Sequence, residues 1–212
     1  SPHVMFVKQQ LVKEPFTRYA MLQKGEADIV AGLTGPLLDK MRENKDVRII
    51  SARYSGSRML FFNFDKFPEA KDKRVREAIG YAIDRNEIAT KLLKGACQPS
   101  DEVITPATFG YLPGLKSLPY DPTKAKALLK QAGIPIGKEV TFVVNTEGSS
   151  LPNAPQVLEA IAGNLSAVGF KIVRETYDTA AWNTMMRSGK QAGIFYGTTA
   201  IPDDAGALIE TW

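Results

Sequence analysis

The stretch from residue 139 to residue 197 alternates between strand-like and helix-like segments joined by short links. Apolar residues crowd three short stretches, and the two longer stretches between them carry apolar residues at helical spacing. Strands that alternate with helices over short links imply right-handed crossovers, and therefore a parallel sheet. The chain is thus predicted to be an α/β protein, with strands at 139–144, 170–176 and 192–197 and helices at 154–168 and 179–188.

Two helices are predicted between residues 73 and 93, with a capping signal between them. The first, at 73–83, carries apolar residues on one face. Asp84 follows it, and Glu87 stands three residues further on. This spacing is a variant of the capping box, in which Asp84 accepts from a first-turn amide and Glu87 bonds back. The second helix is expected to start after Asp84, run to residue 93 and be closed by Gly95.

The other elements are shorter or less regular. Asp121 and Pro122 open a helix that Gly133 ends. Residues 97–120 are rich in proline and glycine, and an irregular excursion of this length is often functional. Toward the start of the sequence, helices are predicted at 16–24 and 36–44, and strands at 4–8, 27–31, 47–52 and 58–64.

The sequence lacks the residues that most catalytic centres require. Its one histidine is His3, although hydrolytic sites commonly use a histidine base. One histidine and one cysteine are too few for a zinc site, and no phosphate-binding loop has the required spacing. Asp203 and Asp204 form a carboxylate pair, but adjacent acids in a loop are more often solvated or capping residues. We therefore expect no enzyme, no cofactor and no metal.

Charge and hydropathy argue against two further kinds of partner. Basic residues outnumber acidic ones by 27 to 23, but the two kinds are interspersed, as in the run from Lys71 to Arg74. A nucleic-acid-binding domain usually gathers its basic residues on one face, so no nucleic acid is expected. No run of about 18 apolar residues occurs, so no direct membrane insertion is expected. Residues 1–25 contain no visible signal peptide.

Three stretches, in order along the chain, resemble a known family. They are LQKGEADI at 22–29, Phe62-Asn63 followed by RVREAIGYAIDR at 74–85, and YDP at 120–122 followed by KA at 124–125 and LLKQAG at 128–133. Together they resemble family 5 of the extracellular solute-binding proteins, which deliver peptides, nickel complexes and related solutes to ABC importers. The second stretch is the most specific, because length and order agree throughout it. The resemblance runs through nearly the whole chain.

The resemblance implies a fold of the periplasmic-binding-protein type II kind, with two α/β lobes joined by hinge strands and the ligand held between them. Residues 1–55 would form part of the first lobe and lead to the hinge. Residues 56–200 would form the second lobe, with a mixed or parallel sheet flanked by helices. Residues 201–212 would return through the hinge. Family members are usually more than twice this length, so the chain is expected to be a truncated form that covers mainly the second lobe.

The implied function is that of the solute-binding component of an ABC importer for peptides or related small molecules. Its partners would be a peptide-like solute and a membrane permease, and its location would be the periplasm. An alternative on the same fold is a peptide-sensing or chaperone-like adaptor.

In peptide binders of this family, the ligand backbone pairs with a strand of this lobe that leads into a Gly-Trp motif and then an acidic residue. The glycine matches at Gly197, but Thr198 replaces the aromatic residue and the acid would fall near Ile201. Asp203 and Asp204 match a later aspartate. This departure weakens the case for peptides with a free amino terminus, and leaves room for modified peptides, opines or sugars. An exposed strand edge would still offer unpaired N–H and C=O groups to an extended ligand.

The other candidate ligand-binding residues lie in or near this strand. Tyr196 is predicted to face the cleft rather than the core, and Thr199 continues the same strand. Arg58 would meet an anionic ligand group, with a surface ion pair as the alternative. Asn63 would bond a ligand or stabilise a strand end. Asn145 follows the carboxyl end of a strand, where open α/β sheets tend to bind ligands.

Overall fold

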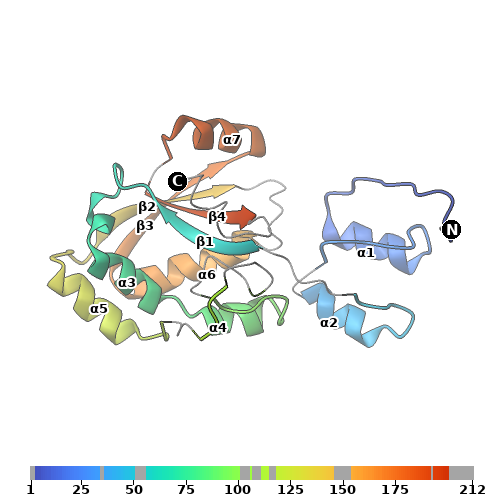
Figure 1. The fold of residues 1–212 in the computed structure, drawn as a ribbon, viewed down its shortest axis with the longest axis horizontal. Coiled ribbons are helices and arrows are strands. Elements are labelled where there is room, and N and C mark those ends of the chain that lie inside the picture. The colour runs from blue at the N-terminus through green and yellow to red at the C-terminus, as the bar shows by residue number, and fades with distance from the viewer. Residues whose placement is uncertain are drawn as a thin grey trace.

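The computed structural model describes residues 3–33, 36–50, 56–100, 106, 111–114, 118–145, 154–191 and 193–200. Figure 1 shows the strands β1–β4 and the helices α3–α7 gathered in one body, with α1 and α2 beside it. The elements are α1 (Pro15–Gln23), α2 (Pro36–Glu43), β1 (Gly56–Phe62), the 3-10 turn η1 (Pro68–Lys71), α3 (Lys73–Ala82), α4 (Arg85–Glu87), the π-helical turn η2 (Ile88–Leu92), α5 (Pro122–Gln131), β2 (Lys138–Asn145), α6 (Ala154–Ala167), β3 (Phe170–Tyr177), α7 (Thr179–Ser188) and β4 (Ile194–Ala200).

The strands form one mixed sheet in the order β1-β4-β2-β3. The strands β3 and β4 both run parallel to β2, as the alternation of strands and helices predicts. The strand β1 joins β4 in antiparallel pairing, which makes the sheet mixed. The helices that connect the parallel strands, α6 and α7, lie on opposite sides of the sheet (Figure 1).

The main core fills the space between one face of the sheet and the helices α3, α5 and α6. Alternate residues of β2 and β4 point into it, because successive side chains of a strand face opposite sides. Phe142 and Ile194 are each 1% exposed, and Leu165 of α6 is fully buried among them. Burial of such side chains stabilises each by about 1.5–3 kcal/mol, so this face of the sheet is fixed by its apolar pattern.

Four aspartates begin four of the helices, and each caps a backbone amide near the start of its helix. Asp72 accepts from the Arg74 amide of α3 at 2.8 Å. The other three accept from the amide three residues on: Asp84 from Glu87 at 2.8 Å, Asp121 from Lys124 at 2.8 Å and Asp178 from Ala181 at 2.7 Å. Helix starts were therefore well predicted wherever the sequence has an Asp in the capping position.

The predicted second half of the capping box at Asp84 is wrong. The Glu87 carboxylate bonds the Lys91 ammonium, one turn ahead, at 2.8 Å instead of returning to the start of the helix. The predicted helix to residue 93 also changes form, because α4 has only three residues and continues as the π-helical turn η2. The amide of Gly95 closes this turn by donating to the carbonyl of Ala89 at 2.8 Å.

The helices α1 and α2 form a second, smaller apolar cluster. It is built on Tyr19, Leu33, Leu37 and Met41. Both helices were predicted within one residue of their observed ends. The strands predicted at 4–8 and 27–31, and at 47–50 within 47–52, are wrong: none of these residues forms a strand, and residues 51–52 lie outside the described part. A short apolar run becomes a strand only where a partner strand pairs with it.

Among the described residues, polar contacts at Lys94 join this smaller cluster to the main body. The Arg42 guanidinium of α2 donates to the Lys94 carbonyl at 3.2 Å. The Lys94 ammonium pairs with the Asp39 carboxylate at 3.3 Å, and Asp39 also pairs with Arg42 at 3.2 Å. We call these three residues the Lys94 clasp. Lys94 has a left-handed backbone with φ 54°, an uncommon conformation for a residue with a side chain.

Candidate functional site

The strand β4 is paired along its whole length on one side and only at its beginning on the other. It pairs with β1 from Ile194 to Ala200. Toward β2, the recorded pairs are those of Ile194 and Phe195. From residue 196 to residue 200, β4 has no partner on that side within the described part of the chain. This free edge of β4 presents backbone donors and acceptors of the kind to which an extended molecule can add as a further strand.

On one face of the sheet, Tyr196 of β4 has Arg58 near it on the neighbouring strand β1. Tyr196 follows the same face of β4 as Ile194 and is half-buried against the main core, which differs from the prediction that it faces the cleft rather than the core. Burial raises the pKa of the Tyr196 phenol to about 12, against a smaller opposing effect of the Arg58 charge. The phenol is therefore a neutral hydrogen-bond donor at physiological pH. Arg58 is exposed on β1, opposite Thr198, and the register puts it on the Tyr196 face.

Cys97 lies close enough to these residues to interact with them electrostatically. Burial raises the pKa of its thiol, while the Arg58 charge lowers it. The net effect is upward, which leaves Cys97 a neutral thiol at physiological pH rather than a reactive thiolate.

The opposite face of β4 is aromatic. The rings of Phe61 and Phe195 are stacked, with centroids 5.0 Å apart and planes at 9°. A Cβ atom built on Gly197 would lie 2.9 Å from Cε2 of Phe61. The Phe61 ring therefore lies over the position where any larger residue at 197 would place its side chain.

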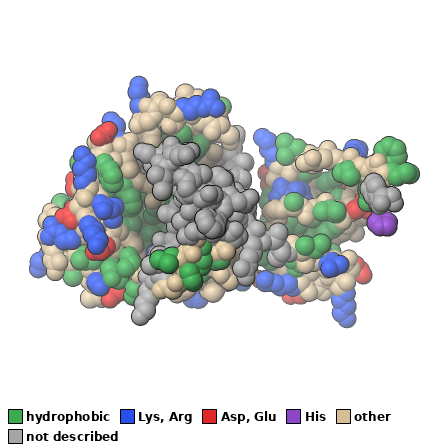
Figure 2. Space-filling view, in the orientation of Figure 1, with side chains coloured by type: hydrophobic (Ala, Val, Ile, Leu, Met, Phe, Trp, Pro, Cys, Tyr) green, Lys and Arg blue, Asp and Glu red, His purple; other side chains and the backbone are tan. Residues whose placement is uncertain are grey.

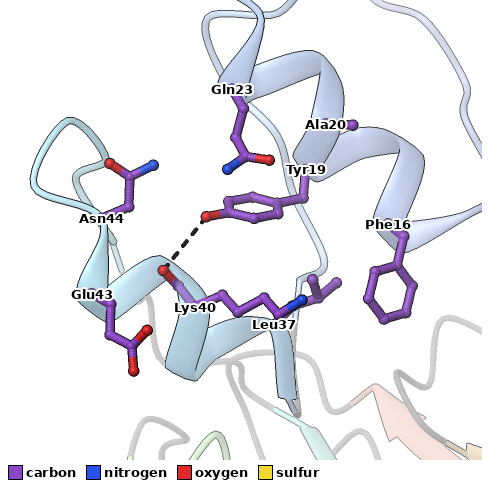
Figure 3. Close-up of a pocket in the computed structure, with 8 residues that line it drawn as sticks. All are labelled: Phe16, Tyr19, Ala20, Gln23, Leu37, Lys40, Glu43 and Asn44. Carbon is purple, nitrogen blue, oxygen red and sulfur yellow. Dashed lines mark hydrogen bonds between the residues drawn. The ribbon is translucent and has the colours of Figure 1, made fainter.

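A separate depression of about 540 Å³ lies between α1 and α2. Figure 3 shows the Tyr19 ring directed from α1 toward α2, where its hydroxyl donates to the Lys40 carbonyl at 3.5 Å. The depression is lined by Phe16, Tyr19, Ala20, Gln23, Leu37, Lys40, Glu43 and Asn44. None of the predicted site residues belongs to it.

The described residues contain no group of three or more His, Cys, Asp or Glu side chains placed to hold a metal ion. Within the same described residues, no helix has the length and apolar character needed to cross a membrane.

The family model described as "Bacterial extracellular solute-binding proteins, family 5 Middle" matches residues 1–212, the whole chain. This chain belongs to that family. Its members are solute-binding proteins, and the relatives below are named as binding proteins, in agreement with the expectation that the chain is not an enzyme.

Similar proteins support this family 5 membership. Heme-binding protein A of Haemophilus influenzae is 31% identical over 198 residues, which cover 92% of this chain and 36% of that protein. The dipeptide-binding protein of Escherichia coli is 26% identical over 211 residues, which cover 99% of this chain and 39% of that protein. The chain thus spans well under half the length of these relatives.

A solved structure shares the fold. The periplasmic binding protein DppA from Helicobacter pylori, in complex with the peptide STSA, superposes with a TM-score of 0.77 at 24% identity. The match covers 89% of this chain and 36% of that protein. The fold of this family 5 chain is therefore that of a periplasmic binding protein, as its sequence motifs predicted.

The predicted site residues of this family 5 chain fall into three groups. Tyr196, Gly197, Thr198 and Thr199 lie in β4, with Arg58 beside them on β1. Asn145 ends β2, the strand from which β4 separates. Asp203 and Asp204 lie outside the described residues.

Asn63 stabilises a strand end, which is the role predicted as the alternative to ligand binding. Its side-chain amide donates to the Gln191 carbonyl, and its side-chain oxygen accepts from the Asp65 amide at 3.0 Å. The Asn63 backbone amide donates to the Gly193 carbonyl at 2.9 Å. Asn63 therefore ties the end of β1 to the turn that leads into β4.

Sequence reasoning missed Phe61. The aromatic run of 61–64 was visible in the sequence, but its relation to Gly197 depends on the register of β1 against β4. No local pattern specifies that register.

Proposed function

We propose that this chain supplies the second lobe of the solute-capturing component of an ABC-type importer. Residues 1–55 would belong to the first lobe and lead to the hinge, residues 56–200 would form the second lobe, and residues 201–212 would return through the hinge. Two separate apolar clusters support this division. So does the apolar surface of residues 3–50, where Val4, Met5, Phe6, Val7 and Leu11 are exposed. Figure 2 shows hydrophobic side chains gathered on that part of the molecule.

The observation that carries the proposal is the free edge of β4. A solute with an extended backbone would add to this edge by main-chain hydrogen bonds. The site would consist of Arg58, Asn145, Tyr196 and the backbone of 197–199, with Asp203 and Asp204 following in the chain. Asn63 would contribute by fixing the end of β1.

The solute class that fits this edge best is peptide-like. Relatives named for dipeptide and heme binding, and a structural neighbour in complex with a peptide, support small organic solutes. The proposed partner of the closed, loaded protein is a membrane permease, and the proposed location is the periplasm.

Capture requires no chemical step. A solute that contacts both lobes favours the closed arrangement because its interactions are complete only there. The neutral Tyr196 phenol and the Arg58 guanidinium would then hold solute groups by hydrogen bonds, while closure removes water around them.

Strand addition is tested by removing hydrogen-bond donors from the solute. Binding of N-acetyl-Ala-Ala-Ala and of its backbone N-methylated form to the full-length protein that contains this chain is measured by calorimetry. The N-methylated form should bind about tenfold more weakly or worse, because each lost main-chain bond leaves a partner unpaired.

A second measurement tests whether the chain holds only half of the cleft. The 212-residue chain alone should bind the same peptide on the order of millimolar or more weakly. Equal affinity for both peptide forms, or a dissociation constant on the order of micromolar for the chain alone, would refute the proposal.

A further inference from the structure

We infer that the free edge of β4 discriminates between solutes by the groups that they present to the two faces of the sheet, which we call side selection. It requires an apolar group over the face that carries Phe61. It requires a hydrogen-bond-accepting or anionic group over the face that carries Arg58. This inference rests on the proposed function, since it assumes that an extended solute adds to β4.

The apolar requirement comes from Gly197. Phe61 belongs to β1, on the far side of β4 from the free edge. Because Gly197 has no side chain, the Phe61 ring lies over the β4 backbone, stacked on Phe195. A solute strand beside Gly197 would therefore have an aromatic surface next to it on this face. Apolar solute groups gain by covering such a surface, whereas charged groups lose hydration there.

The polar requirement comes from the other face. Arg58 and Tyr196 are diagonal neighbours across the β1–β4 pair, because Arg58 stands opposite Thr198 and Leu60 opposite Tyr196. The guanidinium has only donors and the neutral phenol has a donor hydroxyl. Two donors on one face favour a carboxylate or a carbonyl-rich group, and the Arg58 charge favours the carboxylate.

The two requirements have a fixed spacing along an extended solute. Successive residues of a strand point to opposite faces, so the apolar and the anionic groups belong on adjacent residues. The solute class is therefore an extended peptide-like molecule with one apolar residue next to one acidic residue.

The experiment uses calorimetry on the full-length protein with N-acetyl-Ala-Ala-Ala and with N-acetylated tripeptides carrying one Phe or one Glu at each position. Phe at one position and Glu at an adjacent position should each strengthen binding by roughly five- to tenfold. Gly197→Ala, whose Cβ displaces the Phe61 ring, should abolish the preference for Phe and leave that for Glu. Arg58→Gln should abolish the preference for Glu and leave the preference for Phe.

Matched controls separate these effects from general damage. Gly163→Ala makes the same change on α6, where a Cβ would meet nothing within 4 Å, and should leave both preferences intact. Arg187→Gln removes a charge from the exposed last turn of α7 and should also leave them intact. Phe61→Leu supplies a second variant of the aromatic face in case Gly197→Ala fails to fold.

The outcomes distinguish a failure of the proposed function from a failure of the side selection alone. If no tripeptide binds, the proposed peptide capture fails and this inference fails with it. If tripeptides bind without a preference at any position, or if the two preferences survive Gly197→Ala and Arg58→Gln, the proposed function stands and only the side selection is overturned.

Discussion

At the scale of single residues, the stretch from Arg74 to Arg85 is explained by structural contacts. The Arg76 guanidinium donates to the Ala70 carbonyl at 2.7 Å, and the Arg85 guanidinium donates to the Leu118 carbonyl. Gly80 lies directly under Leu118. The contacts of Arg85 and Gly80 fasten the end of the irregular excursion, at Leu118, onto α4 and α3. The stretch that most clearly indicated the family therefore encodes the scaffold rather than the solute.

The effect of Gly80→Ala on the free energy of unfolding should change sign when the Leu118 side chain is shortened. A Cβ at residue 80 would lie 2.7 Å from Cδ1 of Leu118, and such crowding costs about 1–3 kcal/mol. The change also gains up to about 1 kcal/mol of helix propensity. We expect a net loss of up to about 2 kcal/mol in the wild type and a gain in the Leu118→Ala background, where the overlap is gone. Urea denaturation measures both, and a loss of equal size in both backgrounds would contradict the contact.

At the scale of elements, the Asp84 cap joins two helices. Its side chain accepts from the Glu87 amide at the start of α4, and its backbone amide donates to the Asn164 side chain of α6 at 3.0 Å. Asp84→Ala should destabilise the chain by about 0.5–2 kcal/mol in urea denaturation, because the first turn loses its acceptor. Asp84→Asn keeps an acceptor and should be nearly neutral. If the two variants unfold alike, the side chain is not the cap.

The elements also show how far sequence patterns reach. Helices with an Asp cap, such as α5 and α7, and strands placed between helices, such as β2 and β3, were predicted almost to their ends because local chemistry specifies them. The apolar runs at 4–8 and 27–31 failed because pairing, rather than composition, makes a strand. The separation of β4 from β2, and with it the free edge, depends on tertiary pairing and could not be predicted from sequence.

At the scale of the whole molecule, the Lys94 clasp joins the proposed first lobe to the second. Arg42 and Asp39 belong to residues 1–55, and each contacts Lys94 of the proposed second lobe. A contact between the two lobes favours the arrangement in which they are together.

Breaking the clasp should therefore loosen the proposed lobes. We expect Lys94→Gln or Asp39→Asn to shift the ratio of closed to open full-length molecules by roughly two- to fivefold toward open, the range for an exposed ion pair. Single-molecule energy transfer between dyes on Gln23 and Lys126, in a Cys97→Ser background, measures the ratio without any solute. The double variant should add little to either single one, because both remove the same pair. Lys91→Gln is the matched control, since Lys91 pairs with Glu87, one turn away on the same helical segment and also within the proposed second lobe. If Lys94→Gln behaves like Lys91→Gln, the clasp is only a surface contact and does not bias the lobes.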